Sequence, residues 1–108
     1  MTDRGSHVPL IVSWPETITP GTRCDDLVEL ADFLPTFLQI ASAPKPMQRV
    51  HGQSFLPQLL DKEEPSRQWV PIDYKNNRQI RTREWIYTRN ENLTRVNALG
   101  RRGHCQRD

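Results

Sequence analysis

The fold class depends on one stretch near the N-terminus, TDRGSHVPLIVSWP (residues 2–15). It begins as a polar, glycine-containing loop and continues into HVPLIVSW (residues 7–14), an apolar run that is typical of a strand buried on both faces. Such a strand needs other strands to pair with its backbone groups and further elements to cover its faces. The stretch therefore predicts one buried strand and raises the question of which strands lie beside it.

The composition limits the size of any core. Only 35% of the 108 residues are hydrophobic and nine are prolines, which divide the chain into short elements, so we expect at most one small domain. No run approaches the roughly 18 consecutive apolar residues of a membrane span, and the first residues lack a signal-peptide pattern. We therefore expect no membrane partner, and the localisation stays open.

Neither cysteine predicts a metal site. Cys24 and Cys105 lie far apart, without a CxxC spacing or a neighbouring pair of histidines. A single disulfide between them stays an open alternative.

Two short helices are predicted, each with a proline in its first turn. In the first, Asp32 is the expected N-cap and Pro35 falls where a helix has no use for its missing N–H, so the helix is expected at about 33–42. Its expected apolar face is formed by Leu34, Phe37, Leu38 and Ala41. In the second, Ser54 is the expected cap and Pro57 follows three residues later. The side chains expected to pack there are Phe55, Leu56, Leu59 and Leu60.

A small antiparallel strand pair is predicted after the helices. WVPIDY (residues 69–74) has strand composition, and RQIRTREWIYTRN (residues 78–90) alternates, with Asn76 and Asn77 as the expected turn. Read as one strand, the second segment places Ile80 and Ile86 on one face and Trp85 and Tyr87 on the other. Residues 91–108 have few apolar groups to offset the entropy of ordering, so we expect them to be disordered. We call them a basic tail because more than half of the fifteen Lys and Arg residues lie from Arg78 onward.

The order of these motifs resembles a known family. GSHVPLIVSWP, PGTRCDDLVELADFLPTFLQIA, HGQSFLPQLL and RQIRTREWIYTRN are similar, in that order, to the C-terminal portion of formylglycine-dependent sulfatases of the alkaline phosphatase superfamily. The resemblance covers residues 2 to about 90. It implies a fragment of the α/β sulfatase fold, with residues 1–60 in the main α/β domain, 61–90 in a partial antiparallel C-terminal subdomain, and 91–108 as the tail.

The resemblance implies very little catalytic machinery in these residues. Intact members hydrolyse sulfate esters with a formylglycine made from a CxPSR motif and with a bound calcium. Here Glu63 stands where the nucleophile of Pro65-Ser66-Arg67 would be, and we treat that match as chance. We therefore expect no catalytic residue, no metal ligand and no cofactor in this chain. His7, at the start of the apolar run, is the one residue that the resemblance places near a substrate, where an imidazole can donate to a sulfate oxygen.

The leading hypothesis is a truncated sulfatase that is inactive alone, whose partner is the missing N-terminal sulfatase portion. Intact members are often periplasmic, secreted or lysosomal, and whether the isolated chain is an enzyme stays open. One alternative is a small basic nucleic-acid-binding protein, which is disfavoured because the arginines follow no helical stripe with interleaved aromatics. Another is an interaction module that completes another sulfatase chain by strand addition along residues 7–14.

Overall fold

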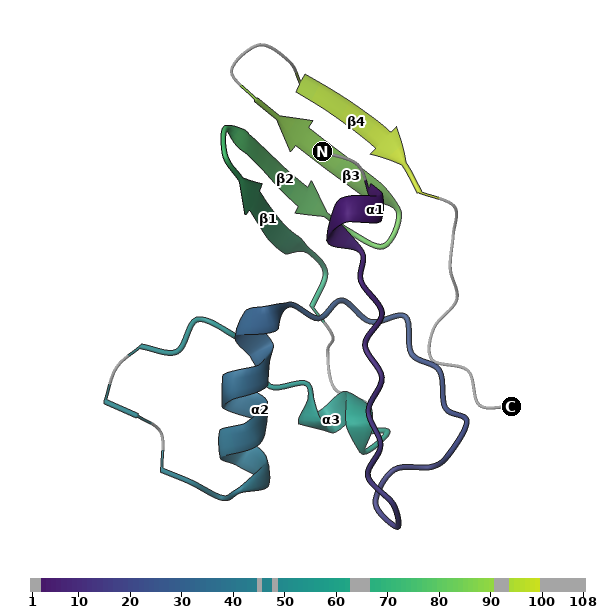
Figure 1. Ribbon diagram of the computed structural model, residues 1–108, viewed down its shortest axis with the longest axis vertical. Coiled ribbons are helices and arrows are strands. Elements are labelled where there is room, and N and C mark those ends of the chain that lie inside the picture. The colour runs from purple at the N-terminus through teal and green to yellow at the C-terminus, as the bar shows by residue number, and fades with distance from the viewer. Residues whose placement is uncertain (1–2, 45, 48, 63–66, 91–93, 100–108) are drawn as a thin grey trace.

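The computed structural model describes residues 3–44, 46–47, 49–62, 67–90 and 94–99. Along the chain these residues form the helices α1 (Asp3–Ser6), η1 (Leu30–Asp32), α2 (Phe33–Ile40) and α3 (Leu56–Leu59), followed by four strands. The strands make one antiparallel sheet on one side of the molecule, and α2, α3 and a long extended N-terminal segment lie on the other side (Figure 1). The predicted α/β class is therefore confirmed in coarse terms, since the structure combines short helices with one antiparallel sheet of four strands.

The sheet is a meander in the order β1-β2-β3-β4. Its strands are β1 (Val70–Tyr74), β2 (Asn77–Arg81), β3 (Trp85–Arg89) and β4 (Thr94–Ala98). Tyr74 pairs with Asn77, so the turn consists of Lys75 and Asn76, one residue earlier than predicted. Lys75 takes a left-handed φ of 52°, a conformation that two-residue hairpin turns use.

Residues 78–90 form two strands, and this corrects the predicted faces. Thr82 closes a short loop between β2 and β3, because its N–H donates to the Trp85 carbonyl at 2.9 Å and its hydroxyl accepts from the Trp85 N–H at 2.9 Å. Arg81 consequently lies opposite Ile86, whereas Ile80 lies opposite Tyr87. Ile86 is buried and Ile80 is exposed, so the two do not share a face as the single-strand interpretation required.

The predicted disordered tail is wrong for residues 94–98, which form β4. Thr94 pairs with Arg89 and Ala98 with Trp85 along the full length of β3. All five residues of β4 are exposed. The strand is therefore held by backbone hydrogen bonds, which do not depend on the apolar side chains that the sequence lacks. Residues 91–93 and 100–108 of the predicted tail, which include Cys105 of the alternative disulfide, lie outside the described residues.

Residues 7–14 do not form a buried strand in this chain. They are extended but belong to neither a helix nor a strand, and Ile11 is 90% exposed. The physical reason is that a strand needs a neighbour's backbone, and the four strands of the sheet pair with one another instead. A strand at residues 7–14 within a larger sheet stays a prediction, as does the division of the chain at residue 60.

The two helices begin where the prolines predict, but they bury different side chains. α2 has Pro35 in its first turn and α3 has Pro57 there. Leu34 and Phe37, expected on the buried face of α2, are exposed, whereas Thr36 is only 1% exposed. The expected packing at the second helix is confirmed for Phe55 and Leu56, both of which are buried.

Thr36 joins α2 to the segment that leads into α3. Its hydroxyl donates to the Asp32 carbonyl at 2.6 Å and accepts from the Phe55 N–H at 3.0 Å. The Phe33 and Phe55 rings meet edge to face, with centroids 5.4 Å apart, directly beside this contact. A threonine in mid-helix thus satisfies a buried backbone N–H from a segment that has no helical or strand partner for it.

Replacing Thr36 with Val is expected to lower the free energy of unfolding by about 1–3 kcal/mol, because the Phe55 N–H would be left buried without an acceptor. Thr36→Ser keeps the hydroxyl and loses one methyl group, so its expected cost is smaller, about 0.8 kcal/mol. Urea unfolding followed by circular dichroism measures both. Thr36→Val keeps the methyl group, so an unchanged free energy of unfolding in that variant would refute the role of the hydrogen bond.

Candidate functional site

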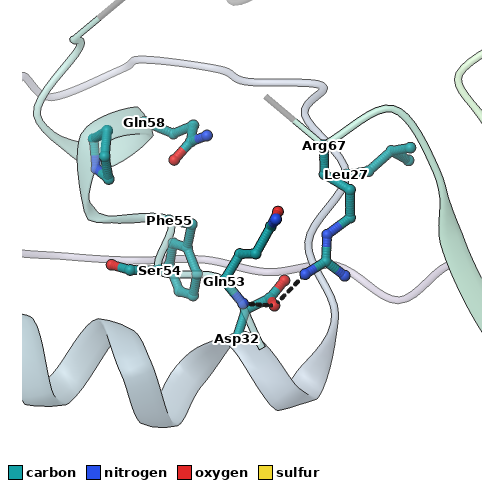
Figure 2. A pocket seen from close by; sticks show the side chains of 8 residues that line it. Leu27, Asp32, Gln53, Ser54, Phe55, Gln58 and Arg67 are labelled. Atoms are coloured by element: carbon teal, nitrogen blue, oxygen red, sulfur yellow. Dashed lines mark hydrogen bonds and ion pairs between the residues drawn. The ribbon is translucent and has the colours of Figure 1, made fainter. Parts of the chain in front are cut away.

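The carboxylate of Asp32 is a buried polar group that accepts hydrogen bonds from three segments of the chain. Asp32 is 2% exposed. Its Oδ2 accepts from the Glu29 N–H at 2.8 Å, and its Oδ1 accepts from the Gln53 N–H at 2.7 Å and from Arg67 Nη2 at 2.6 Å (Figure 2). Asp32 was expected to cap α2, but its side chain makes no such bond. It caps η1 instead and holds two further segments.

Arg67 links the Asp32 carboxylate to the start of the sheet. Its side chain is 12% exposed and forms ion pairs with Glu29 and Asp32, and the chain enters β1 three residues later. A second ion pair joins Asp26, in the segment before η1, to Arg83 in the loop between β2 and β3. Two arginines from the sheet side of the molecule thus bind carboxylates from the helical side. Removal of one partner from a buried ion pair leaves an uncompensated buried charge, which costs more than the loss of a surface pair.

A cavity of about 230 Å³ lies beside these groups (Figure 2). Its lining is formed by Leu27, Asp32, Gln53, Ser54, Phe55, Pro57, Gln58 and Arg67. The Ser54 hydroxyl accepts from the Leu56 N–H at 3.2 Å, close to its expected capping role. The Gln58 Oε1 atom is buried and has no hydrogen-bond partner in the described structure.

This arrangement fits a structural role better than a catalytic one. The carboxylate of Asp32 is already occupied by three donors, and no histidine or cysteine lines the cavity to act as a base or a nucleophile. At Gly52 an added Cβ would lie 2.0 Å from the Ala31 carbonyl oxygen, so the chain presses directly on η1 beside Asp32. Glycine is required there by close packing of two backbones.

The calcium that the sulfatase resemblance implies does not fit the described residues. They contain no group of three or more His, Cys, Asp or Glu side chains that could hold a metal ion. The carboxylates of Glu29 and Asp32 both form ion pairs with the Arg67 guanidinium. A hard cation needs several oxygen ligands, and here the positive charge is already supplied by the protein.

His7, the one substrate-binding residue expected from the sequence, lies apart from this cavity. It is exposed, at the start of the extended segment, and it lines neither the cavity at Asp32 nor the groove described next. Arg67, in contrast, was assigned to a chance motif in a surface connection. No sequence signal could have found its partner, because Asp32 and Arg67 are separated by 35 positions and follow no common motif.

A second hollow, of about 400 Å³, is an apolar groove between the extended N-terminal segment and the helices. We call it the apolar groove. It is lined by Leu10, Ile11, Val12, Ser13, Trp14, Phe33, Thr36, Phe37, Ile40, Phe55 and Leu59. None of these side chains is charged. Several stay exposed, among them Leu10, Ile11 and Phe37. Exposed apolar patches of this kind are found at protein–protein, membrane and ligand-binding sites.

Comparison with known proteins identifies the class. The chain is 34% identical over 104 residues to an ulvan-active sulfatase of Formosa agariphila, with 87% of the chain covered. It is 33% identical over 100 residues to arylsulfatase K of Gallus gallus, with 81% covered, and 35% identical over 63 residues to steryl-sulfatase of Homo sapiens, with 57% covered. The chain is thus similar to sulfatases, as the order of its motifs predicted.

The family can be stated more closely. Residues 1–94 match the family described as N-sulphoglucosamine sulphohydrolase, C-terminal, and the chain belongs to that family. It spans 21%, 18% and 11% of the lengths of the three relatives named above. Among the described residues, no helix is both long enough and apolar enough to cross a membrane.

Exchanging Asp32 for Asn is expected to lower the free energy of unfolding by roughly 3 kcal/mol, because it breaks a buried ion pair and leaves Arg67 with one carboxylate fewer. The matched control is Asp73→Asn. Asp73 lies 4.0 Å from Arg78 in a pair whose side chains are 72% and 84% exposed, and such pairs contribute about 0–1 kcal/mol. Denaturant unfolding measures both variants, and a comparable loss in the two would refute the structural role of Asp32.

Proposed function

We propose that this chain is a C-terminal sulfatase region that completes the fold of a catalytic domain and does not carry the hydrolytic machinery itself. The proposal is supported by the family match of residues 1–94 and by the small share of each relative that the chain spans. The sequence has no CxPSR motif, and no histidine or cysteine lines the cavity at Asp32. The reaction served by the complete protein is hydrolysis of a sulfate ester.

The observation that carries the proposal is the apolar groove. Isolated apolar side chains at a surface are normal, but here a continuous set from three segments faces one hollow. Interfaces that stay assembled are apolar and have few charges at their centre, and the groove has this composition. We propose that the remaining sulfatase polypeptide packs into it, with residues 7–14 pairing as a strand at the edge of the larger sheet.

His7 belongs to the same proposal. It stands at the start of residues 7–14, so packing of this segment into a larger sheet would fix its imidazole at the end of a strand. We propose that His7 donates to a sulfate oxygen in the assembled protein.

The first test is an assay of the purified chain alone. We expect no release of sulfate from an aryl sulfate above the rate in buffer, because rate enhancements of about 8 kcal/mol or more require a nucleophile and positioned charges that one histidine does not supply. Sulfate release by the chain alone that His7→Ala abolishes would overturn the proposal.

The second test is complementation. The ulvan-active sulfatase of Formosa agariphila, lacking the region that matches this chain, is co-expressed with it, and the two should co-elute in size-exclusion chromatography. Ile11→Asp, which places a charge in the apolar groove, should abolish co-elution. Met47→Asp is the matched control, because Met47 is exposed and does not line the groove. Co-elution that both variants retain would remove the groove as the docking site.

A further inference from the structure

The molecule has a second exposed surface besides the apolar groove, on one face of the sheet. This face is formed by the odd-numbered residues of β1 and β3 and by the residues of β2 and β4 that pair with them. We call it the outer face. Strand pairing aligns one residue from each strand in a single row: Pro71, Ile80, Tyr87 and Val96. In the next row Trp85 lies opposite Ala98. Tyr87 is 40% exposed and Trp85 49%, so two aromatic rings stand open to solvent two residues apart on β3.

The neighbouring row on the outer face concentrates positive charge. Arg78 lies directly opposite Arg89, Asp73 lies opposite Arg78, and Thr94 lies opposite Arg89. Like charges directly opposite each other on a sheet are destabilising. The Asp73–Arg78 ion pair, at 4.0 Å between largely exposed side chains, offsets this weakly. Two arginines against one aspartate leave the row with an excess of positive charge that a bound anion would relieve.

The outer face differs from the apolar groove in the partner that it suits. The groove has no charged lining residue, whereas the outer face sets two guanidinium groups beside two exposed aromatic rings. Guanidinium groups match the planar pairs of oxygens that sulfate, phosphate and carboxylate present. The face of an aromatic ring packs against the apolar C–H face of a sugar ring. Tyr87 lies about 7 Å along β3 from Arg89, and Trp85 lies about 7 Å further along the same strand. Along β3 the outer face thus presents one guanidinium group followed by two aromatic rings.

We propose that the outer face binds a sulfated polysaccharide, with Arg78 and Arg89 on its sulfate groups and Tyr87 and Trp85 against its sugar rings. The inference rests on the proposed function, because a polymer that bears many sulfate esters can place sulfate groups on Arg78 and Arg89 while another of its esters is the substrate. It adds a second contact for the polymer, on residues that do not line the groove. Binding here raises the local concentration of esters near the assembled enzyme.

Binding of the full 108-residue chain to dextran sulfate, with neutral dextran as the reference, tests the proposal. We expect the chain to bind dextran sulfate and not neutral dextran. Arg89→Ala should weaken binding roughly tenfold, as expected for the loss of a charge-assisted hydrogen bond. Arg95→Ala is the matched control, since it removes the same charge from the same sheet but from the opposite face, where Arg95 pairs with Thr88. It should change the affinity less than twofold.

A second pair of variants separates ring contact from charge. Trp85→Ala and Tyr87→Ala leave the net charge unchanged and should each weaken binding, with unfolding curves showing that the fold persists. Equal weakening by Arg89→Ala and Arg95→Ala, or full affinity in both aromatic variants, would overturn the proposal. So would equally tight binding of single-stranded DNA, which would indicate a general polyanion surface. The groove variant Ile11→Asp should retain dextran sulfate binding, so loss of docking and loss of glycan binding are separately observable.

Discussion

The buried carboxylate of Asp32 is the interaction on which the rest of the structure depends. It accepts hydrogen bonds from η1, from the segment before α3 and from Arg67 at the entrance to the sheet. Burying a carboxylate costs several kcal/mol unless donors surround it, and these three contacts offset that cost. The described core contains only four buried apolar side chains, those of Phe55, Leu56, Val70 and Ile86. Polar contacts therefore decide how the helical part and the sheet are joined.

Local rules in the sequence predicted much of the secondary structure. Pro35 and Pro57 located the helix starts, because a proline fits the first turn of a helix and no later one. The composition of Val70–Tyr74 predicted β1. Each of these signals acts within a few residues. The family was predicted as well, since four ordered motifs carry more information than any one of them.

The features that the sequence could not predict all depend on distant partners or on loop length. Asp32 and Arg67 are an ordinary cap and an ordinary surface arginine until the fold brings them together. The outer face exists only because the loop closed by Thr82 reverses the chain between β2 and β3 and places Ile80 beside Tyr87. A continuous strand would have buried one and exposed the other. β4 was missed because backbone pairing leaves no mark in the apolar pattern.

The apolar groove shares residues with the contacts that stabilise this chain. Thr36 and Phe55 line the groove, and the same two residues share the hydrogen bond that ties α2 to the segment before α3. Thr36 in turn donates to the backbone carbonyl of Asp32, which lies in the carboxylate cluster. A polypeptide that covers the groove excludes water from these bonds and lowers the local dielectric, which strengthens satisfied hydrogen bonds and ion pairs. The partner that completes the sulfatase fold would therefore also tighten the contacts around Asp32 that hold the sheet in place.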